Sequence, residues 1–209
     1  MKKTAVIFGA GEPNIKQVNL PADCLVWAAD GGLAYCNTLG ITPDFIIGDF
    51  DSLGYVPENA VVLPVQKDLT DLEAAVTDAE EKGCDEFYIY GGTGNRLDHT
   101  LGNIALLIAL SKKGKCAFLC DCNYTVTAVT NGAIHFDADE RGTVSVFAAD
   151  KEVHGVTIRG LLYELQNATL TNDVTLGVSN ELTGQEASVG VTDGTLVIVK
   201  TNITRAGHM

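Results

Sequence analysis

Residues 45–52 read Phe45-Ile46-Ile47-Gly48-Asp49-Phe50-Asp51-Ser52, an apolar run that ends in a glycine and two aspartates. A short, continuously apolar run is typical of a strand buried on both faces of a parallel sheet. In an open α/β sheet, ligands bind in the crevice at the carboxyl ends of the strands. The stretch therefore predicts an α/β sheet whose functional groups follow its strands.

Further aspartates occupy equivalent positions in the first half of the chain. They lie in three segments, Asp30-Gly31-Gly32, Lys67-Asp68-Leu69-Thr70-Asp71 and Arg96-Leu97-Asp98-His99. Each segment follows a predicted strand or begins a predicted helix, so we expect these carboxylates to converge on one crevice. Converging carboxylates repel one another unless a cation lies between them. Mg²⁺ takes oxygen ligands and often carries nucleotide phosphates, so the pattern predicts metal-assisted phosphate chemistry.

Apolar runs alternate with helical patterns up to about residue 120. The expected strands are 5–8, 25–29, 45–47, 61–65, 87–90 and 117–119. Apolar residues fall at helical spacing from Leu69 to Ala79 and from Leu97 to Ile108. Gly83 and Gly114 follow these patterns, where a C-terminal glycine belongs. The first half is therefore predicted to be a mostly parallel sheet with helices packed on it.

The pattern changes after about Asn123. Short strand-like runs follow at 125–129, 143–147, 156–158, 168–170, 187–191 and 196–199. Asn131-Gly132, Thr183-Gly184 and Asp193-Gly194 separate them, and an Asp-Gly pair between two such runs predicts a hairpin. This half is typical of an antiparallel β-sandwich or barrel. We expect two domains, an α/β domain of residues 1–122 and a β-sandwich domain of residues 123–209.

Composition excludes several classes of function. The net charge is −13 and the pI about 4.5, which argues against nucleic-acid binding because that needs clustered Lys and Arg. The six cysteines lack the paired spacing of a zinc site and are expected to be thiols. The amino terminus is a poor signal peptide, and no apolar run is long enough to cross a bilayer. We therefore expect a cytoplasmic protein with no membrane or nucleic-acid partner.

Three motifs carry the expected chemistry. Asp49 and Asp51 point the same way if the chain between them is extended, and could then share a metal ion. Thr70-Asp71-Leu72-Glu73 is a capping box, in which Asp71 either complements the helix dipole or faces a metal-bound phosphate. Lys67, just before it, could neutralise phosphate oxygens.

The third motif is the glycine-rich turn Gly91-Gly92-Thr93-Gly94-Asn95 between a strand and a helix. Glycines let the backbone approach an anion, although the turn matches no general nucleotide fingerprint. Asn95 could equally be an N-cap, and Asp98 an acid of the first helical turn. Arg96 is the stronger signal, because the helix dipole disfavours a cation there while its guanidinium suits bidentate phosphate binding. His99 is assigned no catalytic role.

The order and content of these segments resemble one family, the thiamine pyrophosphokinases or thiamine diphosphokinases. In the first half the resemblance rests on Asp30-Gly31-Gly32, Pro43-Asp44, the segments 48–52, 67–71 and 91–99, and Asn103-Ile104. In the second half it rests on Gly160-Leu161-Leu162-Tyr163 and Gly177-Val178-Ser179-Asn180-Glu181. Each motif is weak alone, but together they span the chain in the family's order. Glu164 departs from the pattern, since many bacterial members have proline there.

The resemblance implies an α/β domain followed by a β-sandwich, and transfer of pyrophosphate from ATP to the hydroxyethyl group of thiamine. It assigns Mg²⁺ to Asp49, Asp51 and Asp71, and catalysis to Asp51, Asp71 and Asp98. It assigns ATP binding to Asp30, Lys67, Thr70, Gly92, Asn95 and Arg96. Thiamine binding falls to Ser179 and Asn180. It also implies a homodimer in which the partner subunit completes the active site.

Two alternatives from other classes remain open. A glycosyltransferase could use Asp49-Phe50-Asp51 to hold a metal–nucleotide sugar, but the segment 91–98 and Ser179-Asn180 would then be unexplained. A non-catalytic nucleotide or thiamine sensor could keep Ser179 and Asn180 while losing acidic residues, yet none is lost here. Release of AMP from ATP and thiamine would distinguish the enzyme from both.

Overall fold

The computed structural model describes residues 2–11, 15–51, 53–64, 68–94 and 96–202 of the 209-residue chain. The chain divides into two compact units. The first comprises Met1–Leu106 and Lys115–Asp121, and the second comprises Leu107–Gly114 and Cys122–Met209. In the described residues no helix is both long and apolar enough to cross a membrane.

The first unit contains a parallel sheet. Its strands are β1 (Thr4–Phe8), β2 (Leu25–Ala29), β3 (Phe45–Gly48), β4 (Val61–Val62), β5 (Glu86–Tyr90) and β6 (Cys116–Cys120). Within the unit they lie in the order β6-β5-β1-β2-β3-β4, and every neighbouring pair is parallel. The expected α/β sheet is confirmed. The chain order reverses beside β1, because β2 lies on one side of it and β5 on the other.

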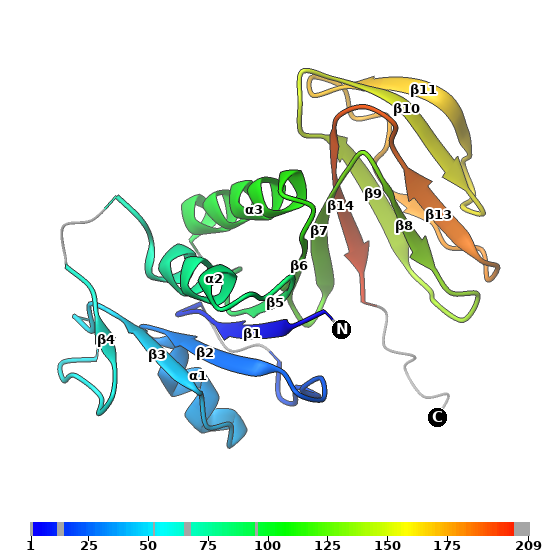
Figure 1. Ribbon diagram of the computed structural model, residues 1–209. Coiled ribbons are helices and arrows are strands. Elements are labelled where there is room, and N and C mark those ends of the chain that lie inside the picture. The colour runs from blue at the N-terminus through cyan, green and yellow to red at the C-terminus, as the bar shows by residue number, and fades with distance from the viewer. Residues whose placement is uncertain (1, 12–14, 52, 65–67, 95, 203–209) are drawn as a thin grey trace, which may run out of the picture. The chain divides into compact units, whose positions relative to one another are not determined.

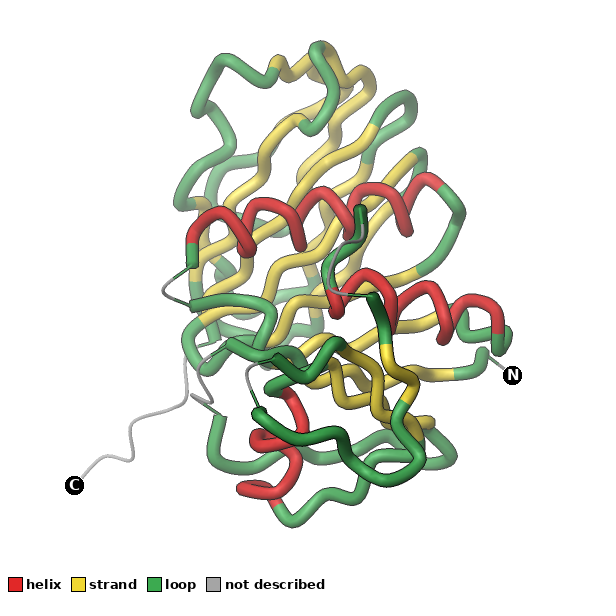
Figure 2. The backbone as a smooth tube through the Cα atoms, turned by 90° about the vertical axis from the view of Figure 1, so that its left-hand side faces the viewer, coloured by secondary structure: helices red, strands yellow, loops and turns green. Residues whose placement is uncertain are grey.

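Among the described residues, three helices connect these strands: α1 (Gly32–Leu39), α2 (Asp71–Glu81) and α3 (Leu97–Lys112). Helices α1 and α2 lie on opposite sides of the strands (Figures 1 and 2). Strand alternation explains the arrangement, since Val6 and Phe8 pack with Leu33 and Tyr35 of α1, whereas Trp27 contacts α2. Helix α1 was not expected, because its eight residues are too few to establish a helical period.

The N-cap expected at Thr70 and the glycines expected after α2 and α3 are confirmed. Thr70 is the N-cap of α2, and its hydroxyl oxygen accepts a 3.1 Å hydrogen bond from the backbone N–H of Glu73. Gly83 and Gly114 follow α2 and α3 with φ of +83° and +76°. These left-handed conformations suit glycine, which has no Cβ to clash. The cap fixes where α2 begins, and so where Asp71 lies.

The second unit is antiparallel. Its strands are β7 (Tyr124–Thr130), β8 (Ala133–Phe136), β9 (Thr143–Ala148), β10 (Glu152–Arg159), β11 (Leu165–Thr171), β12 (Asn180–Glu181), β13 (Ala187–Gly190) and β14 (Thr195–Thr201). Two sets form, in the orders β12-β9-β14-β7 and β11-β10-β13-β8. Val146 and Ile198 from the first set share one core with Ile158 and Val189 from the second. The unit is therefore a sandwich, as the sequence indicated.

The hairpin predicted at Asp193-Gly194 is wrong. The pair joins β13 to β14, but β13 pairs with β8 and β10 whereas β14 pairs with β7 and β9. Gly194 does adopt the positive φ that such a turn needs, at +111°. Burial decides the pairing instead, because each strand turns its apolar side into the common core. Strands β8 and β12 were not expected, the first because it is mostly exposed and the second because it has two residues.

Candidate active site

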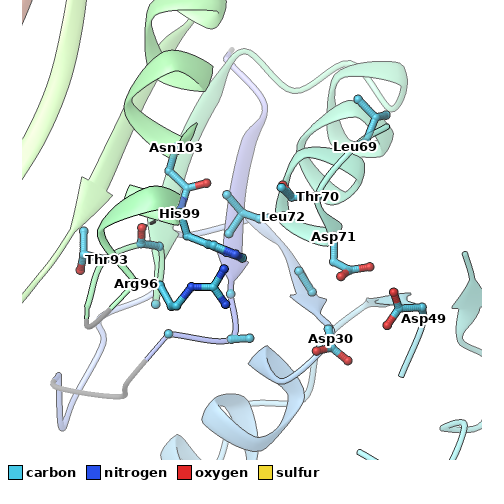
Figure 3. Close-up of a pocket in the computed structure, with 16 residues that line it drawn as sticks. Asp30, Asp49, Leu69, Thr70, Asp71, Leu72, Thr93, Arg96, His99 and Asn103 are labelled. Atoms are coloured by element: carbon cyan, nitrogen blue, oxygen red, sulfur yellow. Dashed lines mark hydrogen bonds between the residues drawn. The ribbon is translucent and has the colours of Figure 1, made fainter. Parts of the chain in front are cut away.

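A pocket of about 570 Å³ opens in the first unit at the carboxyl ends of its strands. This is the edge where an open α/β sheet binds ligands, beside the point where the chain order reverses. The lining residues follow strands or begin helices (Figure 3): Gly9, Ala10, Gly11, Ala29, Asp30, Asp49, Leu69, Thr70, Asp71, Leu72, Gly91, Gly92, Thr93, Arg96, His99 and Asn103. The convergence predicted from the sequence is present for Asp30, Asp49 and Asp71.

Two glycine turns meet at the pocket, one after β1 and one after β5. The N–H of Gly9 donates to Tyr90 O at 2.8 Å, and that of Gly11 donates to Gly91 O at 2.9 Å. A Cβ on Gly11 would lie 2.5 Å from the carbonyl oxygens of both Gly91 and Thr93. Only glycine permits this approach. The turn after β1 was not recognised as part of the site, although a Gly-x-Gly directly after the first strand was the available signal.

Three carboxylates gather beside these turns. Oxygens of Asp30, Asp49 and Asp51 all lie within 4.8 Å of one another. Asp30 is buried, Asp49 is half-buried and Asp51 is exposed. The close approach depends on Gly48, because a Cβ there would lie 3.0 Å from the Cα of Asp30. The end of β3 can therefore place Asp49 next to the end of β2.

The backbone around these acids is strained. Asp30 has φ of +46°, and Phe50, between the two other aspartates, has φ of +57°. The chain is therefore not extended between Asp49 and Asp51, and their carboxylates meet by another route than the sequence suggested. The left-handed turn buries the Phe50 ring and leaves the flanking carboxylates together. Strain of this kind at bulky residues is uncommon and concentrates at functional sites, which makes the cluster a site hypothesis.

Asp71 begins α2 and lines the same pocket. In Figure 3 its carboxylate points to the end of the pocket that holds Asp30 and Asp49. Among the described residues it is not a member of the 4.8 Å cluster, in which Asp30 stands instead. The structure therefore places Asp30, expected to contact ATP, among the carboxylates that could hold a metal ion.

Arg96 and His99 line the other side of the pocket (Figure 3). The Arg96 guanidinium donates two hydrogen bonds to Asp98, from Nε to Oδ1 at 2.9 Å and from Nη2 to Oδ2 at 2.7 Å. This hydrogen bonding holds the pKa of Asp98 well below its usual range. Asp98 itself does not line the pocket. Lys67 and Asn95, the other expected phosphate-binding residues, lie outside the described residues.

The second unit presents Ser179 and Asn180. Ser179 is exposed with φ of +59°, and its N–H donates to Ser145 Oγ at 3.0 Å. Asn180 is buried, and its side chain forms hydrogen bonds with the backbone of Tyr163. Nδ2 donates to Tyr163 O at 2.6 Å, while Oδ1 accepts from Tyr163 N at 2.9 Å. The Asn180 amide therefore fastens the turn after β10, and Ser179 is the more accessible of the two side chains.

Comparison with known proteins decides what this arrangement is. The catalytic-domain model of thiamin pyrophosphokinase matches residues 18–119, and the model of its vitamin B1 binding domain matches residues 132–196. The thiamine pyrophosphokinase of Bacillus subtilis strain 168 is 31% identical over 180 residues, which cover 82% of this chain and 84% of that protein. The chain belongs to the thiamine pyrophosphokinase family.

Solved structures agree with the family assignment. A crystal structure of thiamine pyrophosphokinase from Bacillus subtilis superposes with a TM-score of 0.86 at 29% identity, covering 97% of this chain and 100% of that one. One from Geobacillus thermodenitrificans gives 0.81 at 26% identity, covering 97% and 99%. The activity is thiamine pyrophosphokinase activity, with ATP and thiamine as substrates and thiamine diphosphate and AMP as products. Neither a glycosyltransferase nor a sensor is needed to explain the motifs.

Proposed function

We propose that the pocket of the first unit binds ATP with Mg²⁺ and that Asp30, Asp49, Asp51 and Asp71 form its acidic side. The carboxylate cluster within 4.8 Å carries this proposal, together with the presence of Arg96 in the same pocket. Acidic groups on one side and a guanidinium on the other suit a metal–polyphosphate complex. In this proposal residues 1–122 bind ATP and metal, and residues 123–209 bind thiamine.

The donor set fits Mg²⁺. Every candidate ligand is a carboxylate oxygen, with no sulfur or imidazole in the cluster, and hard divalent cations prefer such oxygens. Asp49, Asp51 and Asp71 are the proposed ligands, and Asp30 supports them from the end of β2. When bound, the ion neutralises phosphate charge and makes the β-phosphorus more electrophilic.

The remaining pocket residues bind and orient the substrate. Arg96 is proposed to hold phosphate oxygens bidentately, and Gly92 to let the backbone approach them. Thr70 presents its polar groups at the start of α2, where the helix dipole favours an anion. Lys67 and Asn95 belong to the ATP-binding set on the family resemblance alone.

A carboxylate near the thiamine hydroxyl accepts its proton or positions the alcohol during the transfer. Asp51 and Asp71 are the candidates for this role, each either as a base or as a metal ligand. Asp98 is a poor proton acceptor, since its hydrogen bonds from Arg96 depress its pKa. We assign it to the active site through Arg96, whose guanidinium it orients.

Thiamine binding is proposed for Ser179 and Asn180, in a site that a second copy of the chain completes. Leu162, Tyr163 and Leu176 are more than half exposed on the loops around these residues. Asn180 holds the first of these loops in place, and fixed apolar patches of this kind usually mark an interface. A homodimer would bury them. Sedimentation and activity of Leu176→Asp, compared at matched concentrations with wild type, test this; a fully active monomer would contradict it.

The acidic chain is proposed to act in the cytoplasm without a nucleic-acid or membrane partner. Its net charge of −13 attracts cationic thiamine and disfavours binding of nucleic acid.

The acidic site is tested by incubating the protein with ATP, Mg²⁺ and thiamine and separating thiamine diphosphate and AMP by chromatography. Asp51→Asn should lose nearly all turnover and keep its fold, because the exposed carboxylate contributes charge and not packing. Asp139→Asn, in an exposed turn of the second unit, is the matched control and should retain activity. A folded Asp51→Asn protein with near-normal turnover would show that Asp51 is not a metal ligand.

A further inference from the structure

Buried polar side chains surround the turn after β5. Thr93, Asn103 and Asp121 are only 7%, 8% and 5% exposed. Asp121 directly follows β6 and does not line the pocket, whereas Thr93 and Asn103 do. A buried carboxylate close to a proposed phosphate-binding turn is costly unless hydrogen-bond donors satisfy it. Its presence there calls for a role.

Asp121 accepts a hydrogen bond from the Thr93 hydroxyl. Thr93 Oγ1 donates to Asp121 Oδ2 at 2.8 Å. A hydroxyl has one proton to donate, so while this bond persists Thr93 has none for a phosphate oxygen. The side chain of Thr93 therefore serves to anchor the turn, and any contact of Thr93 with an anion comes from its backbone N–H.

Two carbonyl groups of the same turn also accept hydrogen bonds. Gly91 O accepts from Gly11 N at 2.9 Å, and Gly92 O accepts from Asn103 Nδ2 at 2.6 Å. In a planar trans peptide the N–H points opposite to the C=O. The N–H groups of Gly92 and Thr93 are therefore directed away from these donors. A turn binds an anion only when N–H groups, and not carbonyl oxygens, face it.

We propose that Asp121 is a positioning residue for ATP binding, which acts through Thr93 to hold the turn Gly91–Gly94 in its anion-binding conformation. The inference rests on the proposed function, in which this turn contacts the phosphates of ATP. Asp121 does not line the pocket and works through its carboxylate oxygen as an acceptor. Its negative charge is not what the turn requires.

Steady-state kinetics on four single variants and one double variant test this. The single variants are Thr93→Val, Thr93→Ser, Asp121→Asn and Asp121→Ala. Thr93→Val should raise the KM for ATP roughly tenfold, the loss expected for one buried hydrogen bond. The KM for thiamine and kcat should change less than about twofold. Thr93→Ser and Asp121→Asn keep the donor and the acceptor, and should stay near wild type. The double variant Thr93→Val/Asp121→Ala should be no worse than Asp121→Ala alone, because both remove one interaction.

Thr195→Val is the matched control. Thr195 is fully buried in the second unit and its hydroxyl hydrogen-bonds that of Thr130 at 2.9 Å, so the same substitution removes a buried hydroxyl outside the unit that contains the turn. Thermal unfolding of each variant separates loss of fold from loss of ATP binding. The conservative variants keep the test decisive if Thr93→Val or Asp121→Ala fails to fold.

Three outcomes overturn the inference. An unchanged KM for ATP in Thr93→Val would show that the Thr93 hydroxyl does not anchor the turn. Additive effects in the double variant would show that Thr93 and Asp121 do not act through one shared interaction. Asp121→Asn as damaging as Asp121→Ala shows that the charge itself matters. Arg96→Ala distinguishes these failures from failure of the proposed function. If Arg96→Ala raises the KM for ATP and Thr93→Val does not, the pocket binds ATP and only the positioning role is wrong. If neither does, ATP binds elsewhere.

Discussion

The indole Nε1 of Trp27 donates a 2.8 Å hydrogen bond to Asp78 Oδ2, which ties strand β2 to helix α2. Trp27 is fully buried and stacks on Phe45 of β3, with ring centroids 4.7 Å apart. Strand β2 is followed directly by Asp30, and α2 begins at Asp71. The bond therefore joins two elements whose ends carry aspartates of the pocket.

Asp78→Ala should destabilise the protein by about 1–3 kcal/mol, because the Trp27 N–H would be left buried without an acceptor. Denaturant unfolding measures the loss. Asp85→Ala is the control, since it removes only the surface ion pair with Lys115 and should cost less than about 1 kcal/mol. Equal losses of unfolding free energy in the two variants would show that the hydrogen bond between β2 and α2 stabilises the protein no more than a surface ion pair does.

The pair of Arg96 and Asp98 makes a prediction about pH. The pKa of Asp98 is lowered by its hydrogen bonds from Arg96, so the carboxylate is ionised throughout the range in which an enzyme is assayed. The stabilisation that the pair contributes is present above the unfolded pKa of about 3.9 and is lost only as pH falls through the lower folded value. The acid limb of the pH–rate profile must then come from another group.

Asp98→Asn should therefore leave that acid limb in place and raise the KM for ATP by less than about fivefold, as expected for an exposed ion pair. Profiles of kcat and kcat/KM against pH for wild type and variant provide the measurement. Loss of the acid limb, or a fall in kcat of several orders of magnitude, would instead make Asp98 the proton acceptor.

The cysteines should differ sharply in reactivity. Burial raises the pKa of the Cys36 and Cys120 thiols to about 12, whereas Cys122 is exposed. At pH 8 only about one in ten thousand of the buried thiols is then ionised, and the thiolate is the reactive form. Iodoacetamide at pH 8 should modify Cys122 and spare Cys36 and Cys120, as read by peptide mass spectrometry. Denatured protein, in which all six should react, is the control; labelling of the buried Cys36 in the folded protein would contradict the prediction.

Much of the fold could be predicted because local signals and burial agree. The strands of the first unit are apolar on both faces, and Thr70 caps α2 as its spacing with Glu73 predicts. The sandwich pairing could not be read from the turns. Asp193-Gly194 has the composition of a hairpin turn, but its flanking strands belong to different sheets and bury their apolar sides in the core that the sheets share. Turn chemistry permits a reversal, and the core decides which strands pair.

The candidate site could likewise be predicted only in part from the sequence. Aspartates at strand ends were visible in the sequence because a parallel sheet gathers such positions. The membership of the carboxylate cluster was not, since Asp30 joins Asp49 and Asp51 through a left-handed backbone and the missing Cβ of Gly48. Asp121 could not be assigned from the sequence either, because its partner Thr93 is reached only through the fold.

The last prediction separates the two substrates. Ser179→Ala should weaken thiamine binding while leaving stability and ATP binding unchanged, because its exposed hydroxyl lies in the second unit. A lost hydrogen bond to a polar ligand group costs about 1–3 kcal/mol, or roughly 5- to 150-fold in affinity. Asn180→Ala should weaken thiamine binding and also lower stability, since its buried amide holds the backbone of Tyr163. Arg96→Ala should weaken ATP binding and spare thiamine. Calorimetric titration of each ligand into each variant decides the matter: if the Ser179 and Asn180 variants lose ATP and keep thiamine, the assignment of thiamine to the second unit is wrong.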